Sequence, residues 1–77
     1  MSHSSGPDNL IKMANQIGSF FDSFTDRELA RNEVAKHLSR FWDPRMRRAI
    51  LAHVGRGGAG LSPLVLAAVA QMKSSPD

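Results

Sequence analysis

The sequence predicts an all-α protein, a small bundle of about four short helices. Apolar residues recur at helical spacing, residues typical of helix starts precede each apolar segment, and no segment alternates apolar and polar residues as a half-buried strand does. With 77 residues and no cysteine, the chain is long enough for one domain and offers no thiolate for a disulfide, a zinc site or an iron–sulfur cluster. We expect one helical domain over residues 8–72, with flexible tails at 1–7 and 73–77.

The first helix is predicted to start after an N-cap at Asp8 and to end near Phe24. At about 100° per residue, its apolar side chains fall within an arc of roughly 120°, which is typical of a helix that packs one side on a core. Ile11 and Gly18 lie outside this arc, on a flank that either faces solvent or accepts a partner. The predicted core side comprises Leu10, Met13, Ala14, Ile17, Phe20, Phe21 and Phe24.

Capping residues define the second and third predicted helices. Thr25 and Glu28 have the spacing of a capping box, which begins the second helix. Asp43 and Pro44 end it and begin the third, because proline restricts the residue before it and suits a first helical turn. His53 lies on the apolar side of the third helix, residues 44–54, where we expect a packed ring with one satisfied nitrogen. The apolar side of the second helix holds Ala30, Val34, Leu38, Phe41 and Trp42.

The last predicted helix, residues 63–72, is apolar around its whole circumference apart from Gln71. A glycine-rich connector at 55–60, predicted to be mobile, precedes it, and Ser62 and Pro63 supply its cap and first turn. A helix of this kind needs cover on every side, and three short helices are expected to leave part of it exposed. We therefore expect part of this surface, or of the Phe/Trp surface, to dock on another chain, which includes self-association when isolated. The alternative is that its alanines face solvent.

No sequence pattern indicates catalysis, a cofactor or a metal. The glycines at 55–60 follow no strand and lack the lysine and hydroxyl residue of a phosphate-binding loop. The acidic residues fall at caps or isolated helical positions, and the three histidines lack metal-ligand spacing. No apolar run approaches the roughly 18 residues of a membrane span, and residues 1–8 do not resemble a secretory signal. We therefore expect a cytoplasmic protein without an active site, cofactor or membrane contact of its own.

The net charge of +3 and a basic central segment raise one alternative, a small helix-turn-helix-like nucleic-acid-binding protein. Two features argue against it. The basic residues are spread around two helices, and the third helix lacks the Asn, Gln and Ser side chains that read bases beside arginine. We therefore expect no nucleic-acid partner, and we expect Arg45, Arg47 and Arg48 to pair with carboxylates within this chain or across an interface.

Four segments between about residues 9 and 70 share their residue order with one known family. The run from Arg40 to Arg47 is the most specific, because its order follows from no general folding rule. Residues 27–33 match only loosely, and residues 67–70 are more apolar than the family's charged ending. The four segments are Met13-Ala14-Asn15-Gln16-Ile17 followed by Phe20-Phe21, Val34-Ala35-Lys36-His37-Leu38, Arg40-Phe41-Trp42-Asp43-Pro44-Arg45-Met46-Arg47, and Gly57-Gly58-Ala59-Gly60-Leu61-Ser62-Pro63-Leu64-Val65.

In these segments the chain resembles the delta subunit of NAD-dependent formate dehydrogenase. The resemblance implies an accessory chain of a cytoplasmic molybdenum- or tungsten-containing complex. That complex oxidises formate and passes electrons through iron–sulfur clusters and flavin to NAD. The chemistry would belong to the larger subunits, and this chain would act by binding them, with the catalytic one as the expected contact. It would be either a permanent subunit or a maturation factor that leaves.

The candidate interface is the corner between the second and third predicted helices. A buried aromatic residue beside an arginine is typical of the energetic centre of an interface. The alternative is that the apolar residues of this corner only close the core of the domain while its arginines face water. The candidate residues are Phe41, Trp42, Asp43, Pro44, Arg45, Met46 and Arg47.

Overall fold

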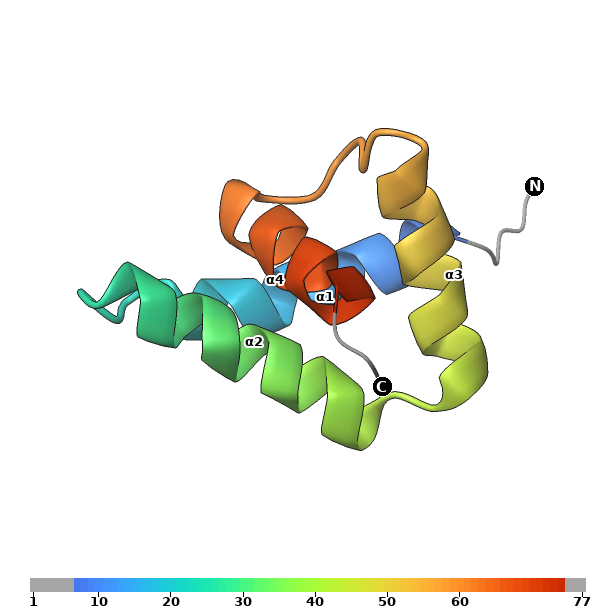
Figure 1. Cartoon of the computed structure of the whole chain (residues 1–77). Coiled ribbons are helices and arrows are strands. Elements are labelled where there is room, and N and C mark those ends of the chain that lie inside the picture. Colours follow the sequence, from blue (N-terminus) through green and yellow to red (C-terminus); the bar gives the residue numbers. More distant parts are fainter. Residues whose placement is uncertain (1–6, 75–77) are drawn as a thin grey trace.

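The computed structural model describes residues 7–74 and shows four helices, with no strand among these residues (Figure 1). The all-α prediction is therefore confirmed. The predicted flexible tails lie mostly outside the described residues; at their inner ends, Pro7 begins the first helix and Lys73 and Ser74 belong to the last. The helices are α1 (Pro7–Phe21), α2 (Arg27–Phe41), α3 (Pro44–Gly55) and α4 (Pro63–Ser74).

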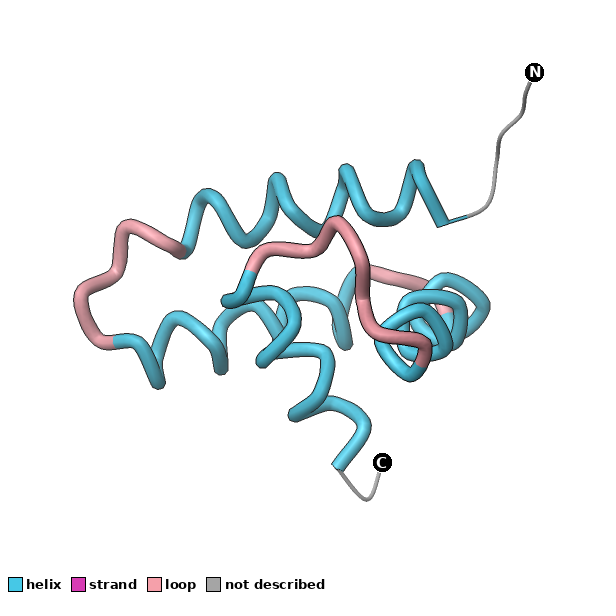
Figure 2. The backbone as a smooth tube through the Cα atoms, turned by 90° about the horizontal axis from the view of Figure 1, so that it is seen from above, coloured by secondary structure: helices cyan, strands magenta, loops and turns pink. Residues whose placement is uncertain are grey.

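The first two helices, α1 and α2, form an antiparallel pair joined by residues 22–26, and α3 lies across the opposite end of the pair (Figure 2). α1 ends at Phe21, so the prediction that it runs to Phe24 is wrong. The chain turns here because the Phe24 amide donates to the Phe21 carbonyl at 3.0 Å. The Arg27 side chain then donates to the carbonyls of Asp22 and Phe24, at 3.0 and 2.9 Å, which satisfies acceptors near the helix end.

The N-cap of α2 is Asp26 rather than the predicted Thr25. The Asp26 carboxylate accepts a hydrogen bond from the Leu29 amide at 3.1 Å, and the backbone of Asp26 is extended. Glu28 lies 3.9 Å from Arg31 on the next turn, in an ion pair. The capping box is wrong by one residue, because the aspartate that follows the threonine takes the capping position.

The predicted start of α3 is confirmed. The Asp43 carboxylate accepts from the Met46 amide at 2.9 Å, and Pro44 occupies the first turn. The start of α4 is confirmed too: the Val65 amide donates to the Ser62 hydroxyl at 3.4 Å, and the helix begins at Pro63.

Hydrogen bonds tie the connector between α3 and α4 to its neighbours. The Asn15 side chain on α1 donates to the Gly60 carbonyl at 2.8 Å and accepts from the Ser62 amide at 3.0 Å. His53 is half-buried, and its Nε2 donates to the Ala59 carbonyl at 2.7 Å, so the predicted packed histidine with one satisfied nitrogen is confirmed. The connector that the sequence predicts to be mobile is therefore attached to both α1 and α3.

α4 occupies the centre of the fold, where it packs against α1, α2 and α3. Val65, Ala68 and Val69 have no exposed surface. Three helices of the same chain cover most of its large side chains, while Ala67 and Ala70 are exposed, so the prediction that part of the helix is left exposed is confirmed. Docking of this surface, or of the Phe/Trp surface, on another chain stays a prediction. The partly buried residues of α4 that pack on the core are Leu64, Leu66 and Met72.

The flank of α1 that carries Ile11 and Gly18 faces the protein interior. Gly18 is buried against Val65 of α4, and half-buried Ile11 lies against the connector at Gly60. Both sequence-based alternatives for this flank, solvent exposure and contact with a partner, are therefore wrong.

Candidate functional site

The corner between α2 and α3 does not present its seven candidate residues on one surface. Phe41 is 69% exposed, whereas the next residue, Trp42, is 6% exposed and belongs to the core. The Trp42 backbone is extended, and its amide donates to the Leu38 carbonyl at 3.1 Å. α2 thus ends between two aromatic residues, one turned to solvent and the other to the core.

The other corner residues divide into those that build the corner and those that solvent can reach. The Asp43 carboxylate caps α3, and Met46 is half-buried against the core. Pro44 and Arg45 are exposed. Arg47 is half-buried, and its guanidinium donates to a carbonyl in the last turn of α2 at 2.9 Å. Asp43 is exposed as well, so the accessible groups of the corner are Phe41, Asp43, Pro44, Arg45 and, in part, Arg47.

Phe41 belongs to a group of five rings at the meeting of α1 and α2, which we call the aromatic patch. The ring centroids of Phe20 and Phe21 lie 4.9 Å apart, those of Phe21 and His37 6.3 Å, and those of His37 and Phe41 4.7 Å. Phe20 is 68% exposed. A shallow pocket of about 390 Å³ opens between the rings of Phe20, Phe21 and His37 and the side chains of Gln16 and Ile17. The members of the patch are Phe20, Phe21, Phe24, His37 and Phe41.

The sequence-based assignment of Phe20 to the core side of its helix is wrong, and so is the alternative that Phe41 only closes the core, because each lies in the last turn of its helix with most of its surface in solvent. One signal in the sequence could have indicated this for Phe20. Phe20 and Phe21 are neighbours, and consecutive helical residues point about 100° apart, so both cannot face the core equally.

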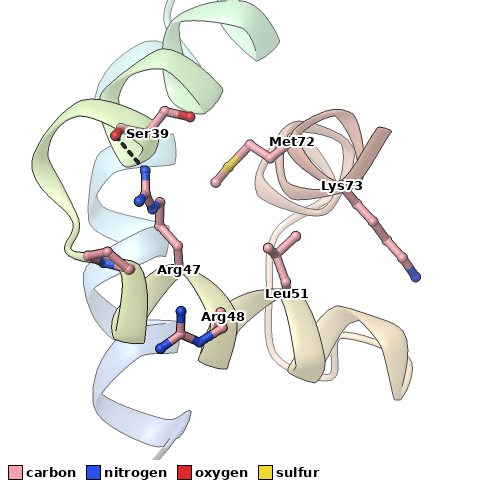
Figure 3. Close-up of a pocket in the computed structure, with 7 residues that line it drawn as sticks. Ser39, Arg47, Arg48, Leu51, Met72 and Lys73 are labelled. Atoms are coloured by element: carbon pink, nitrogen blue, oxygen red, sulfur yellow. Dashed lines mark hydrogen bonds between the residues drawn. The ribbon is translucent and has the colours of Figure 1, made fainter. Parts of the chain in front are cut away.

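A hollow of about 700 Å³, which we call the basic hollow, lies between α3 and the C-terminal ends of α2 and α4. Leu51 and Met72 point into it, while Arg47 reaches to the Ser39 carbonyl (Figure 3). Lys73 extends from α4 away from it. The lining residues are Ser39, Pro44, Arg47, Arg48, Leu51, Met72 and Lys73, of which Pro44 and Arg47 were predicted from the sequence.

Charge is distributed unevenly along the chain. Six of the ten Lys and Arg residues lie between residues 40 and 73, where Asp43 is the only acidic residue. Arg45, Arg47 and Arg48 form no ion pair within residues 7–74, so the predicted pairing with carboxylates inside the chain is not found among these residues, and pairing across an interface stays a prediction. The ion pairs among residues 7–74 lie in the first half of the chain, just before and within α2. They join Arg27 to Asp22, Arg31 to Glu28, and Lys36 to Glu33.

Residues 7–74 hold neither a cluster of metal ligands nor a membrane-spanning helix. No three His, Asp or Glu side chains in this part of the chain come close enough to hold a metal ion. None of its helices combines the length and the apolar character needed to cross a membrane.

These features define a small four-helix protein with an exposed aromatic patch and a hollow lined by basic side chains. The family model of the NADH-dependent formate dehydrogenase delta subunit, FdsD, matches residues 9–69 of the chain. The chain therefore belongs to the formate dehydrogenase delta subunit family, and the resemblance noted from the sequence is confirmed. No curated protein and no solved structure gives a match to the chain.

Proposed function

We propose that the chain is a non-catalytic accessory subunit of a cytoplasmic, molybdenum-containing, NAD-dependent formate dehydrogenase. It stabilises the complex or assists its assembly by docking on the larger subunits, with the catalytic subunit as the contact. Membership of the delta subunit family supports association with the other subunits. The accessible part of the corner, together with the aromatic patch, is the proposed docking surface.

One observation carries this proposal: Phe20 and Phe41 are 68% and 69% exposed and belong to one aromatic patch. The core of the domain is already closed by smaller side chains such as Val34 and Ile50, which have no exposed surface. The two rings therefore contribute little to the free energy of folding. Full burial of such a side chain in an interface contributes about 1.5–3 kcal/mol, and aromatic residues are enriched at the centre of interfaces.

Trp42 holds in place the end of α2 that carries Phe41. Because its ring is buried beside the exposed Phe41, the last turn of α2 is fixed to the core. Exposed Arg45 and half-buried Arg47 belong to the same corner as Phe41, and an aromatic residue with arginine beside it is typical of the energetic centre of an interface.

Deletion of this chain tests the proposal. The remaining complex is purified and assayed for formate-dependent NAD reduction and for molybdenum content. We expect both to fall, because larger subunits that lose a stabilising contact assemble less completely. Unchanged activity and unchanged molybdenum content would contradict the accessory role.

Co-purification then separates the two forms of the proposal. A permanent subunit stays with the larger subunits at near-equal stoichiometry through gel filtration in high salt. A maturation factor is captured only with catalytic subunit that lacks its cofactor. Failure of the chain to associate with either form of the larger subunits would contradict both.

A further inference from the structure

The basic hollow shares Pro44 and Arg47 with the proposed docking surface and extends from it to Arg48, Leu51 and Met72. We propose that it binds an acidic segment of one of the larger subunits. A carboxylate of that segment pairs with Arg47 and Arg48, and a neighbouring apolar side chain packs on Leu51 and Met72. This inference rests on the proposed function, since it names the chemistry of a second contact with the same partner.

Arg47 is already held in position for such a contact. Its guanidinium donates to the Ser39 carbonyl at 2.9 Å, and the residue is half-buried. This is its single side-chain hydrogen bond within residues 7–74, so its other N–H donors are available. An arginine fixed in this way loses less conformational entropy when it pairs with a carboxylate than a freely moving one does.

Arg48 supplies a second cation at the same hollow. It is exposed and forms no ion pair or hydrogen bond with the described residues. The nearest acidic residue in the sequence, Asp43, uses its carboxylate to cap α3. No carboxylate among residues 7–74 forms an ion pair with Arg47 or Arg48, and charge complementarity favours an acidic partner.

The apolar part of the hollow favours a protein segment over a nucleic acid. Leu51 and Met72 point into it from two different helices (Figure 3). A phosphate backbone has no group to place against these side chains, whereas a segment with one apolar and one acidic residue matches both halves of the hollow. Flexible Met72 can adapt to the shape of the apolar group.

The test compares two charge reversals, Arg48→Glu in the basic hollow and Arg56→Glu outside it, in the full chain. Both residues are exposed, and both changes alter the net charge equally. Binding of each variant to larger subunits prepared without this chain is measured at low and moderate salt. We expect Arg48→Glu to bind about tenfold more weakly and to show reduced salt dependence, while Arg56→Glu stays close to wild type.

A zero-length cross-link identifies the contact directly. The variant Arg48→Lys is assembled into the complex and treated with a carbodiimide, which joins an amine to a carboxylate in contact with it. We expect mass spectrometry to find position 48 joined to an Asp or Glu of a larger subunit. The same treatment of Arg56→Lys is the control and is expected to give no such product at position 56.

The outcomes distinguish this inference from the proposed function. If wild-type chain does not bind the larger subunits, both fail. If wild-type chain binds, but the two charge reversals are equivalent and position 48 forms no cross-link, only the acidic-segment contact is overturned. It is also overturned if Arg48→Glu abolishes retention of duplex DNA by the isolated chain and leaves subunit binding unchanged.

Discussion

Gly18 of α1 and Val65 of α4 lie so close together that a Cβ atom built on Gly18 would stand 2.5 Å from Val65 Cγ2. Real Cβ atoms are almost never found at such a distance. Gly18 is buried, and Val65 has no exposed surface. The central helix can therefore approach α1 only because this position has no side chain, and the flank of α1 that looks unused in the sequence is part of the core.

Gly18→Ala is expected to destabilise the domain by about 1–3 kcal/mol, because overpacking in a closed core forces backbone or side-chain shifts. The sign of this change in stability distinguishes overpacking from intrinsic helix propensity. Alanine stabilises an unconstrained helix interior by roughly 0.5–1 kcal/mol relative to glycine, so the intrinsic effect opposes the expected one. Urea unfolding of the full chain measures the difference.

Gly55→Ala is the matched control. Gly55 is the last residue of α3, and a Cβ built on it meets no atom within 4 Å. Its substitution is expected to leave the free energy of unfolding unchanged or to raise it by up to about 1 kcal/mol. Similar destabilisation by both substitutions would contradict the close approach of α1 and α4.

Asn15→Ala is expected to destabilise the domain by about 1–2 kcal/mol. The substitution removes the hydrogen bonds that attach the connector to α1, through the Gly60 carbonyl and the Ser62 amide. Alanine is the better helix former, so a loss of stability must come from the connector. Amide hydrogen exchange at Ser62 measures the effect locally and should be faster in the variant. Unchanged exchange would show that Asn15 does not hold the connector.

Trp42→Ala is expected to destabilise the domain by about 3–5 kcal/mol, because it removes a large buried ring. Small domains have a total stability of roughly 5 kcal/mol or a little more, so the variant should be largely unfolded at moderate temperature. Thermal unfolding followed by circular dichroism measures this. Phe41→Ala, which alters a side chain that is 69% exposed, should melt close to wild type. Equal melting temperatures for the two variants would contradict the finding that the Trp42 ring packs in the core while the Phe41 ring faces solvent.

Asp43→Ala is expected to cost about 1 kcal/mol, because the Met46 amide loses its acceptor at the start of α3. Asp43→Ser keeps an acceptor oxygen and should retain most of the stability. If the two variants unfold at the same urea concentration, the carboxylate does not act as the cap.

Local signals predicted much of the fold. Asp43-Pro44 and Ser62-Pro63 define the starts of α3 and α4 because a capping side chain and a first-turn proline act within a few residues. The position of α4 could not be predicted, since an apolar circumference fits a helix in the centre of a fold as well as one at an interface. The role of Gly18 could not be predicted either, because its neighbour Val65 is distant in the sequence.

The candidate site was predicted only in part. The corner from Phe41 to Arg47 was found from its residue order, and that order does not show that Trp42 turns inward while Phe41 turns outward. The basic hollow depends on residues from three helices, including Ser39 and Met72, whose proximity arises only from packing. The spacing of apolar residues describes one helix at a time, so it does not predict a surface formed by several helices.

The most direct test of this account substitutes both exposed rings of the aromatic patch, Phe20→Ser with Phe41→Ser, and follows the variant through purification of the whole complex. Leu29→Ser is the control, because Leu29 is 42% exposed and lies outside the patch. We expect the double variant to fold as well as wild type, judged by thermal unfolding, and to be lost from the larger subunits, while the control stays bound. A folded double variant that co-purifies at wild-type stoichiometry would contradict the central claim that these rings dock the chain.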